Sequence, residues 1–124
     1  MAEDFRTLLM ESDRLEDGDR WFGDIQIGGW FYFSAQAGPF HDSRPQELLE
    51  NPMGYESFDL RLQTVQGVIS YGRYGAWEDL KTKPWAALFT EDRPTVLHAP
   101  DVPVATCQQI YEDLLAYART NPLP

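Results

Sequence analysis

Residues 21–36 have the sequence WFGDIQIGGWFYFSAQ, and this stretch decides the fold class. The pair Gly28-Gly29 can adopt the positive φ angles that a two-residue hairpin turn requires. On either side, residues 21–27 and 30–36 are rich in aromatic and β-branched side chains, which favour strands. The sequence therefore predicts a β-hairpin whose second strand is apolar on both faces, as a central strand or a strand that faces a partner would be.

Further strands are predicted outward from this hairpin. Polar and apolar residues alternate over 55–64, which indicates a half-buried strand, and residues 68–74 are expected to return beside it as a second hairpin. Residues 85–90 and 95–98 are expected to add two more short strands. The sequence thus contains enough strands for an antiparallel sheet of five or six members.

Helical spacing is clearest near the C-terminus. Apolar residues recur at steps of three and four over 103–119, which predicts a helix packed on the sheet, with Asp101 as its N-cap. A short N-terminal helix is predicted over 3–12 and one helical turn over 76–81. Residues 37–53 are expected to be mostly loop, in which only 45–50 could form a short helix. The expected fold is α+β, with the C-terminal helix covering one face of the sheet and the N-terminal helix at an edge.

Length and composition predict one compact domain. The chain has 124 residues, of which 43% are hydrophobic and 14% aromatic, so residues 1–124 can form a single core with a short tail at 120–124. The only cysteine, Cys107, cannot form an intramolecular disulfide and suits a reducing compartment, so the expected location is cytoplasmic. The N-terminal residues do not have the pattern of a signal peptide, and the sequence contains no run of about 18 apolar residues, so neither secretion by such a signal nor membrane association is expected.

Acidic residues outnumber basic ones by 20 to 10, which gives a net charge of −10. This balance disfavours direct binding to nucleic acid or to anionic lipid. Carboxylates are densest over 11–24, where residues 13–20 are expected to form a solvated connection, and aromatic residues lie beside them. A basic protein partner could be steered to such a surface, although acidic loops can also serve solubility alone. The residues assigned to the partner surface are Glu16, Asp17, Asp19, Trp21, Asp24, Trp77, Glu78 and Asp79.

Catalytic and metal-binding spacings are missing from the sequence. The strongest ligands for soft metals are His41, His98 and Cys107, and none of them lies at the short spacings of a zinc site. Cys107 falls on the apolar face of the C-terminal helix, where a thiol is a small core residue rather than a nucleophile. The sequence therefore predicts no metal, no cofactor and no catalytic residue, although an enzyme stays open as an alternative.

The favoured function is stoichiometric protein binding. A small acidic inhibitor of the immunity, antitoxin or phage anti-defence type would neutralise a basic nuclease or nucleic-acid-binding protein by mimicking nucleic acid in its positive groove. One alternative is a structural assembly subunit that uses exposed strand edges, and the sequence does not predict the oligomeric state. The other is a small enzyme or ligand-binding domain with an aromatic pocket, lined by Trp30, Tyr32, Tyr71, Arg73 and Trp77.

Overall fold

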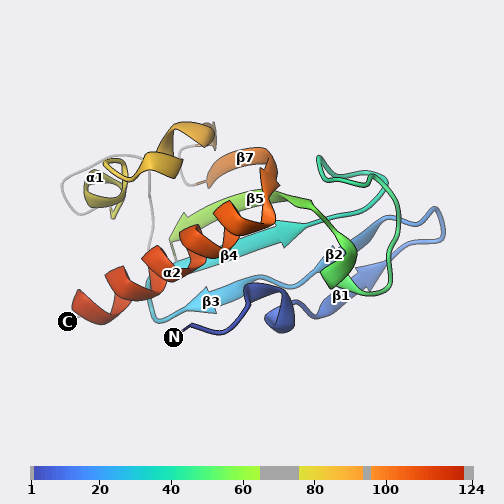
Figure 1. The fold of residues 1–124 in the computed structure, drawn as a ribbon, viewed down its shortest axis with the longest axis horizontal. Helices are drawn as coiled ribbons and strands as arrows, with labels where there is room; N and C mark the ends of the chain where they lie inside the picture. Colours follow the sequence, from blue (N-terminus) through green and yellow to red (C-terminus); the bar gives the residue numbers. More distant parts are fainter. Residues whose placement is uncertain (1, 65–75, 94–95, 122–124) are drawn as a thin grey trace.

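The computed structural model describes residues 2–64, 76–93 and 96–121, and these form an α+β fold. Within these ranges the main sheet is antiparallel and has five strands in the order β3-β4-β5-β7-β6 (Figure 1). Both the predicted fold class and the predicted number of strands are confirmed. The strands are β3 (Ile25–Ile27), β4 (Phe31–Gln36), β5 (Ser57–Thr64), β6 (Thr90–Arg93) and β7 (Val96–Pro103).

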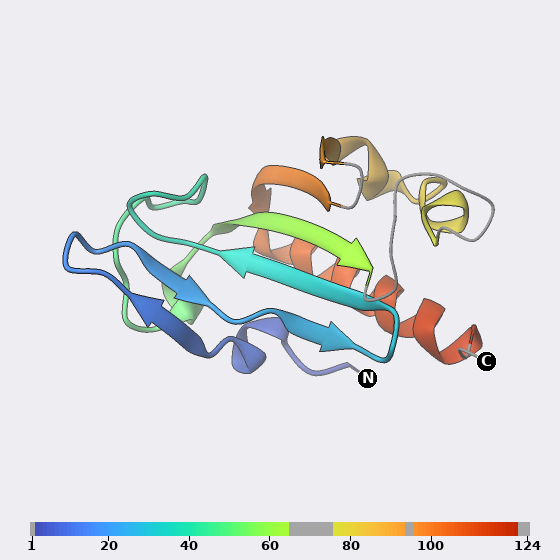
Figure 2. The ribbon, with the colours of Figure 1, turned by 180° about the vertical axis from the view of Figure 1, so that it is seen from behind.

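Helix α2 (Val104–Thr120) lies across one face of this sheet, as the helical spacing predicted (Figure 1). Figure 2 shows the opposite face, which no helix covers in the part of the chain that the structure describes. No helix in those ranges is both long and apolar enough to cross a bilayer. The sheet therefore has one face in the core and one face open to other molecules.

The core forms between α2 and every second residue of the central strands. Strand β5 lies between β4 and β7, and its apolar positions all point to α2 while its polar positions point to the open face. This arrangement confirms the strand predicted from the alternation over 55–64. Fully buried side chains on the core side include Phe31, Phe33, Phe58, Leu60 and Leu62.

The central hairpin differs from the prediction in its turn and in its first strand. Ile27 pairs with Phe31, so the turn contains three residues, and Gly28 has a φ of 59°, which favours glycine. The predicted strand 21–27 is interrupted at residues 23–24, and only its second half belongs to the main sheet. Its first half pairs with a different segment.

That segment forms a second, two-stranded sheet with β2, which corrects two predictions. Strand β1 (Glu11–Arg14) pairs antiparallel with β2 (Arg20–Phe22), so residues 13–20 are a hairpin rather than a simple connection. The predicted helix over 3–12 is reduced to a 3₁₀ helix at Phe5–Leu8, because the chain then extends to enter β1.

Two other local predictions are wrong, and the loop expected around residues 45–50 is confirmed without the short helix that was possible there. Residues 45–50 are not helical and follow a cis peptide bond between Arg44 and Pro45. Residues 85–90 are mostly a 3₁₀ helix, Pro84–Leu88, which begins at a proline, the residue best suited to a helical first position. Asp101 does not cap α2: Pro103 occupies the N-cap position, and the Asp101 carboxylate accepts hydrogen bonds from Arg44 and Ser57 instead.

The helical turn expected over 76–81 is confirmed as α1 (Trp77–Leu80). The strand expected over 68–74 lies outside the described residues, and β5 pairs with β4 and β7.

Candidate functional site

The β1–β2 hairpin extends beyond the end of the main sheet (Figure 2). Its turn is held by a hydrogen bond of 2.9 Å from the Leu15 N–H to the Asp19 carbonyl oxygen, and Gly18 supplies a φ of 92°. The Asp17 carboxylate accepts a hydrogen bond from the Asp19 N–H. Glu16 and Asp17 are therefore held at an exposed tip, where a partner can reach them.

The arginines of the hairpin do not neutralise this tip. Arg14 pairs with Glu11 at 2.6 Å and with Glu50 at 2.9 Å, and Arg20 points into the protein. Among the described residues, no lysine or arginine forms an ion pair with Asp13, Glu16 or Asp17. The tip therefore keeps an unbalanced negative charge.

Arg20 anchors the hairpin to the loop that follows β4. Its side chain is only 1% exposed, and its guanidinium donates hydrogen bonds to the carbonyl oxygens of Leu49 and Ala37 and to the Tyr55 hydroxyl. The guanidinium also lies 4.3 Å from the centre of the Phe22 ring. Carbonyl dipoles and ring faces thus stabilise a buried cation that has no carboxylate partner among the described residues.

A pocket of about 330 Å³ lies between the hairpin and the open face of the sheet. It brings together Trp21 and Asp24 from the predicted partner surface and Tyr32 from the predicted ligand pocket. Desolvation raises the pKa of the Asp24 carboxyl, which has no ion-pair partner in the described part of the chain. Arg61 supplies a cation to the lining and approaches Asp92 at 3.8 Å. The pocket therefore offers one unpaired carboxylate beside an exposed indole.

Asp19 and Trp21 contact the loop that follows β4. The Asp19 carboxylate lies 3.4 Å from Nε2 of the buried His41, and the Trp21 ring packs edge-on against the His41 ring. The Asp19 carboxylate thus faces this loop as well as solvent. Its assignment to the partner surface stays a prediction.

The other half of the predicted partner surface lies elsewhere. Trp77 packs against Trp85 and Phe89, and Glu78 forms an ion pair with Lys81 at 2.8 Å. The Asp79 carboxylate accepts a hydrogen bond from the Tyr117 hydroxyl. Figure 1 places α1 at the opposite end of the molecule from the β1–β2 hairpin, so the eight assigned residues form two separate groups.

The predicted ligand pocket is also not assembled as expected within the described residues. The Trp30 indole donates a hydrogen bond to the Asn121 carbonyl oxygen and packs edge-on against Tyr117, so it joins the turn to the end of α2. Trp77 belongs to the cluster at α1, whereas Tyr32 lines the pocket on the open face. Tyr71 and Arg73 lie outside the described residues.

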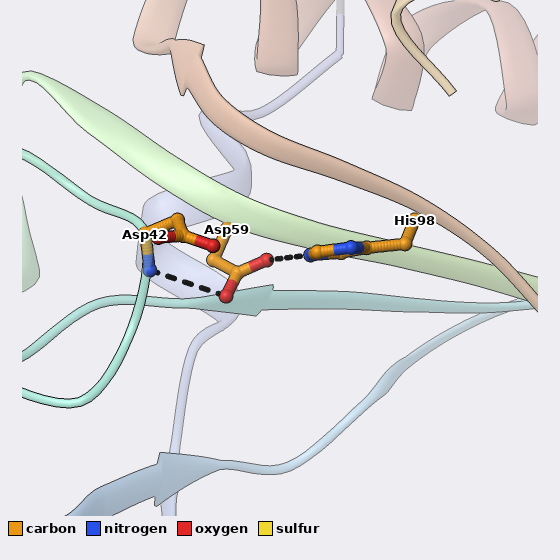
Figure 3. A group of neighbouring side chains, drawn as sticks. All are labelled: Asp42, Asp59 and His98. Atoms are coloured by element: carbon orange, nitrogen blue, oxygen red, sulfur yellow. Dashed lines mark hydrogen bonds and ion pairs between the residues drawn. The ribbon is translucent and has the colours of Figure 1, made fainter. Parts of the chain in front are cut away.

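Sequence reasoning missed a cluster formed by Asp42, Asp59 and His98 (Figure 3). Nε2 of His98 lies 2.6 Å from Oδ1 of Asp59, and the Asp42 N–H donates a hydrogen bond of 3.2 Å to Oδ2 of the same carboxylate. The alternation in β5 places Asp59 on the polar face, which is the one sequence signal for this cluster. The register that brings His98 beside it is not visible in the sequence.

Cys107 is buried on the core-facing side of α2, as expected of a small core residue, and its thiol donates a hydrogen bond to the Val102 carbonyl oxygen. Burial raises the pKa of the thiol from 9.0 to about 12. At pH 8 we expect the folded protein to react with DTNB more than about 100-fold more slowly than the urea-unfolded chain, because the thiolate is the nucleophile. Equal rates for the folded and unfolded chains would contradict this burial.

The same pKa shift predicts the direction of a pH effect on stability. Above about pH 9 the unfolded chain loses the thiol proton while the folded protein keeps it. The stabilisation linked to Cys107 is therefore complete below pH 9 and is lost as the pH rises toward 12. Urea unfolding of the wild type and of Cys107→Ala at pH 7 and 10 measures this, because the alanine variant should lose less stability between the two pH values.

Three features of the molecule are thus candidate functional sites. The hairpin presents unpaired carboxylates, the pocket presents a carboxylate and a guanidinium, and the cluster presents two carboxylates and an imidazole. Their own geometry is the basis for assigning a function, since no family model, no curated protein and no solved structure matches the chain.

Proposed function

We propose that this protein binds a basic protein partner through the β1–β2 hairpin and thereby blocks the partner's activity. The observation that carries the proposal is that both hairpin arginines have other partners: Arg14 pairs with Glu11 and Glu50 at the surface, and Arg20 is buried. Asp13, Glu16 and Asp17 are therefore left without a counter-charge among the described residues. Like charges at an exposed tip repel one another, and lysines or arginines of a partner would remove that repulsion.

Exposed apolar side chains near these carboxylates supply anchors for an interface. Leu15 is 51% exposed, Trp21 is 38% exposed and Phe40 is 58% exposed. The edge-on contact between Trp21 and His41 places the loop that carries Phe40 beside the hairpin. Protein interfaces commonly combine such aromatic anchors with a charged rim. Asp24, at the pocket next to Trp21, would accept a lysine or arginine side chain of the partner.

The partner class that fits best is a nuclease or another nucleic-acid-binding protein. Such proteins carry basic grooves that bind phosphates, and a projecting row of carboxylates offers the same sign of charge. One molecule of this protein, bound in the groove of one partner molecule, would keep nucleic acid out of that groove. The proposed role is therefore that of a small acidic inhibitor of the immunity, antitoxin or phage anti-defence type.

The test compares charge reversal at the two ends of the molecule. The immobilised protein is used to capture proteins from a lysate at about 50 and 500 mM salt. The Debye length, over which charges act on one another, differs about threefold between these two conditions. Association of the captured basic protein is then measured with Glu16→Lys/Asp17→Lys and with the matched control Glu78→Lys/Asp79→Lys. We expect the hairpin variant to associate at least about tenfold more slowly at low salt, with less change in the control.

Two results would count against the proposal. One is an equal loss of association rate in the two variants, because net charge alone would then explain binding. The other is a captured protein that retains full nucleic-acid cleavage or binding in the presence of one equivalent of the inhibitor. A slower rate in the hairpin variant, together with inhibition at one equivalent, supports the proposal.

A further inference from the structure

Asp42, Asp59 and His98 come from three separate segments and meet on the open face of the sheet (Figure 3). Asp59 lies in β5, His98 lies in β7, and Asp42 lies in the loop between β4 and β5. One carboxylate oxygen from each aspartate and one nitrogen of the imidazole all lie within 4.8 Å of one another. This spacing allows a single ion to contact all three side chains.

The cluster carries more negative charge than its own residues can balance. Asp59 is only 5% exposed, and its carboxylate contacts His98 but forms no ion pair with a lysine or arginine of the described ranges. Even a protonated His98 would balance only one of the two carboxylates. The nearby arginines are engaged elsewhere, because Arg44 pairs with Asp101 and Arg61 approaches Asp92. A cation would therefore relieve the repulsion between Asp42 and Asp59.

The backbone of Asp42 is fixed while its side chain is exposed. Its N–H donates to Asp59 at 3.2 Å, and its carbonyl oxygen accepts a hydrogen bond of 2.8 Å from the Asp101 N–H. The Asp42 carboxylate has no hydrogen-bond or ion-pair partner among the described residues. The exposed position of the Asp42 carboxylate leaves the solvent side of the cluster open, so that water can complete the coordination of an ion.

We propose that Asp42, Asp59 and His98 bind one divalent transition cation, for which Zn²⁺ is the best-matched probe. An imidazole nitrogen with two carboxylate oxygens suits zinc and similar ions, whereas Mg²⁺ and Ca²⁺ favour oxygen ligands alone. The ion would replace the hydrogen bond between His98 and Asp59, and its proton would stay on the other ring nitrogen or pass to water, while the two ligand atoms would separate from 2.6 Å to about 3.3 Å. The hairpin takes no part, so this site stands or falls separately from the proposed function.

The test uses the full chain, freed of metal with a chelator, and titrates it with ZnCl₂ in a calorimeter. We expect one equivalent to bind, and Asp42→Asn and His98→Gln to bind more than about tenfold more weakly. Glu56→Gln is the matched control, because it removes one exposed carboxylate just before β5 that is not a ligand and forms no ion pair with a lysine or arginine of the described residues. Its affinity for zinc should stay within about twofold of the wild type. Circular dichroism checks that each variant is folded.

The histidines provide a direct readout, because the chain contains only two. In nuclear magnetic resonance spectra, zinc should shift the ring signals of His98 and leave those of the buried His41 in place. The proposal is overturned if zinc shows no saturable binding, if Glu56→Gln weakens binding as much as Asp42→Asn, or if the His98 signals do not move. Equal affinity for Mg²⁺ at these residues would also overturn the assignment to a transition cation.

Discussion

Replacement of Arg20 by alanine is expected to lower the free energy of unfolding by about 3–5 kcal/mol. The guanidinium is the hydrogen-bond donor to the Leu49 and Ala37 carbonyl oxygens, and it also donates to the Tyr55 hydroxyl. Alanine would leave these acceptors without that donor and open a cavity beside the Phe22 ring. Urea unfolding followed by tryptophan fluorescence measures the loss.

Arg14 provides the matched control, because it lies in the same hairpin but pairs with Glu11 and Glu50 at the surface. Arg14→Ala should cost far less, since exposed ion pairs contribute little to stability. Arg20→Lys should fall between the wild type and Arg20→Ala, because the ammonium keeps the charge but cannot reach all three acceptors. If Arg20→Ala costs no more than Arg14→Ala, then Arg20 does not hold the hairpin on the domain.

Replacement of Phe5 by alanine is also expected to cost about 3–5 kcal/mol. Its ring is fully buried and makes edge-on contacts with Phe33 at 6.2 Å and Phe58 at 5.3 Å between ring centres. The 3₁₀ helix at the N-terminus is therefore part of the core rather than an addition at an edge. Thermal and urea unfolding should both show the loss.

The neighbouring Thr7 controls for local effects in the same 3₁₀ helix. Its side chain is exposed and donates a hydrogen bond to the Asp4 carbonyl oxygen. Thr7→Ala should change stability by about 0.5 kcal/mol or less. Similar losses in both variants would mean that Phe5 contributes through the local helix and not through the core.

Sequence patterns predicted the elements that have one face on the core. In strand β5 the apolar residues recur at every second position, and in helix α2 they recur at every third or fourth position. Both patterns arise because each element buries one face against the other. The strand β1 shows no alternation, since all four of its residues are exposed, and Arg20 in β2 places a charged residue where the pattern requires an apolar one. Strand β1 was therefore not predicted, and β2 was predicted only in part, as the first half of the strand expected over 21–27.

The candidate sites divide in the same way. The acidic tip was predictable because Glu16 and Asp17 lie in one short, locally charged segment. The cluster of Asp42, Asp59 and His98 depends on the pairing of β5 with β7, which includes an irregularity in register between Phe58 and Leu60. Such long-range register is set by the packed sheet and leaves no local pattern in the sequence.

The hydrogen bond from the Phe5 N–H to the Gln108 side chain joins residues 103 positions apart. On a ribosome that adds roughly 5–20 residues per second, the acceptor is made about 5–20 seconds after the donor. Phe33 and Phe58, which pack on the Phe5 ring, are made during that interval, and the contact with α2 comes last. Translation thus exposes an apolar N-terminal segment that chaperones can recognise, and the core closes only after α2 has been synthesised.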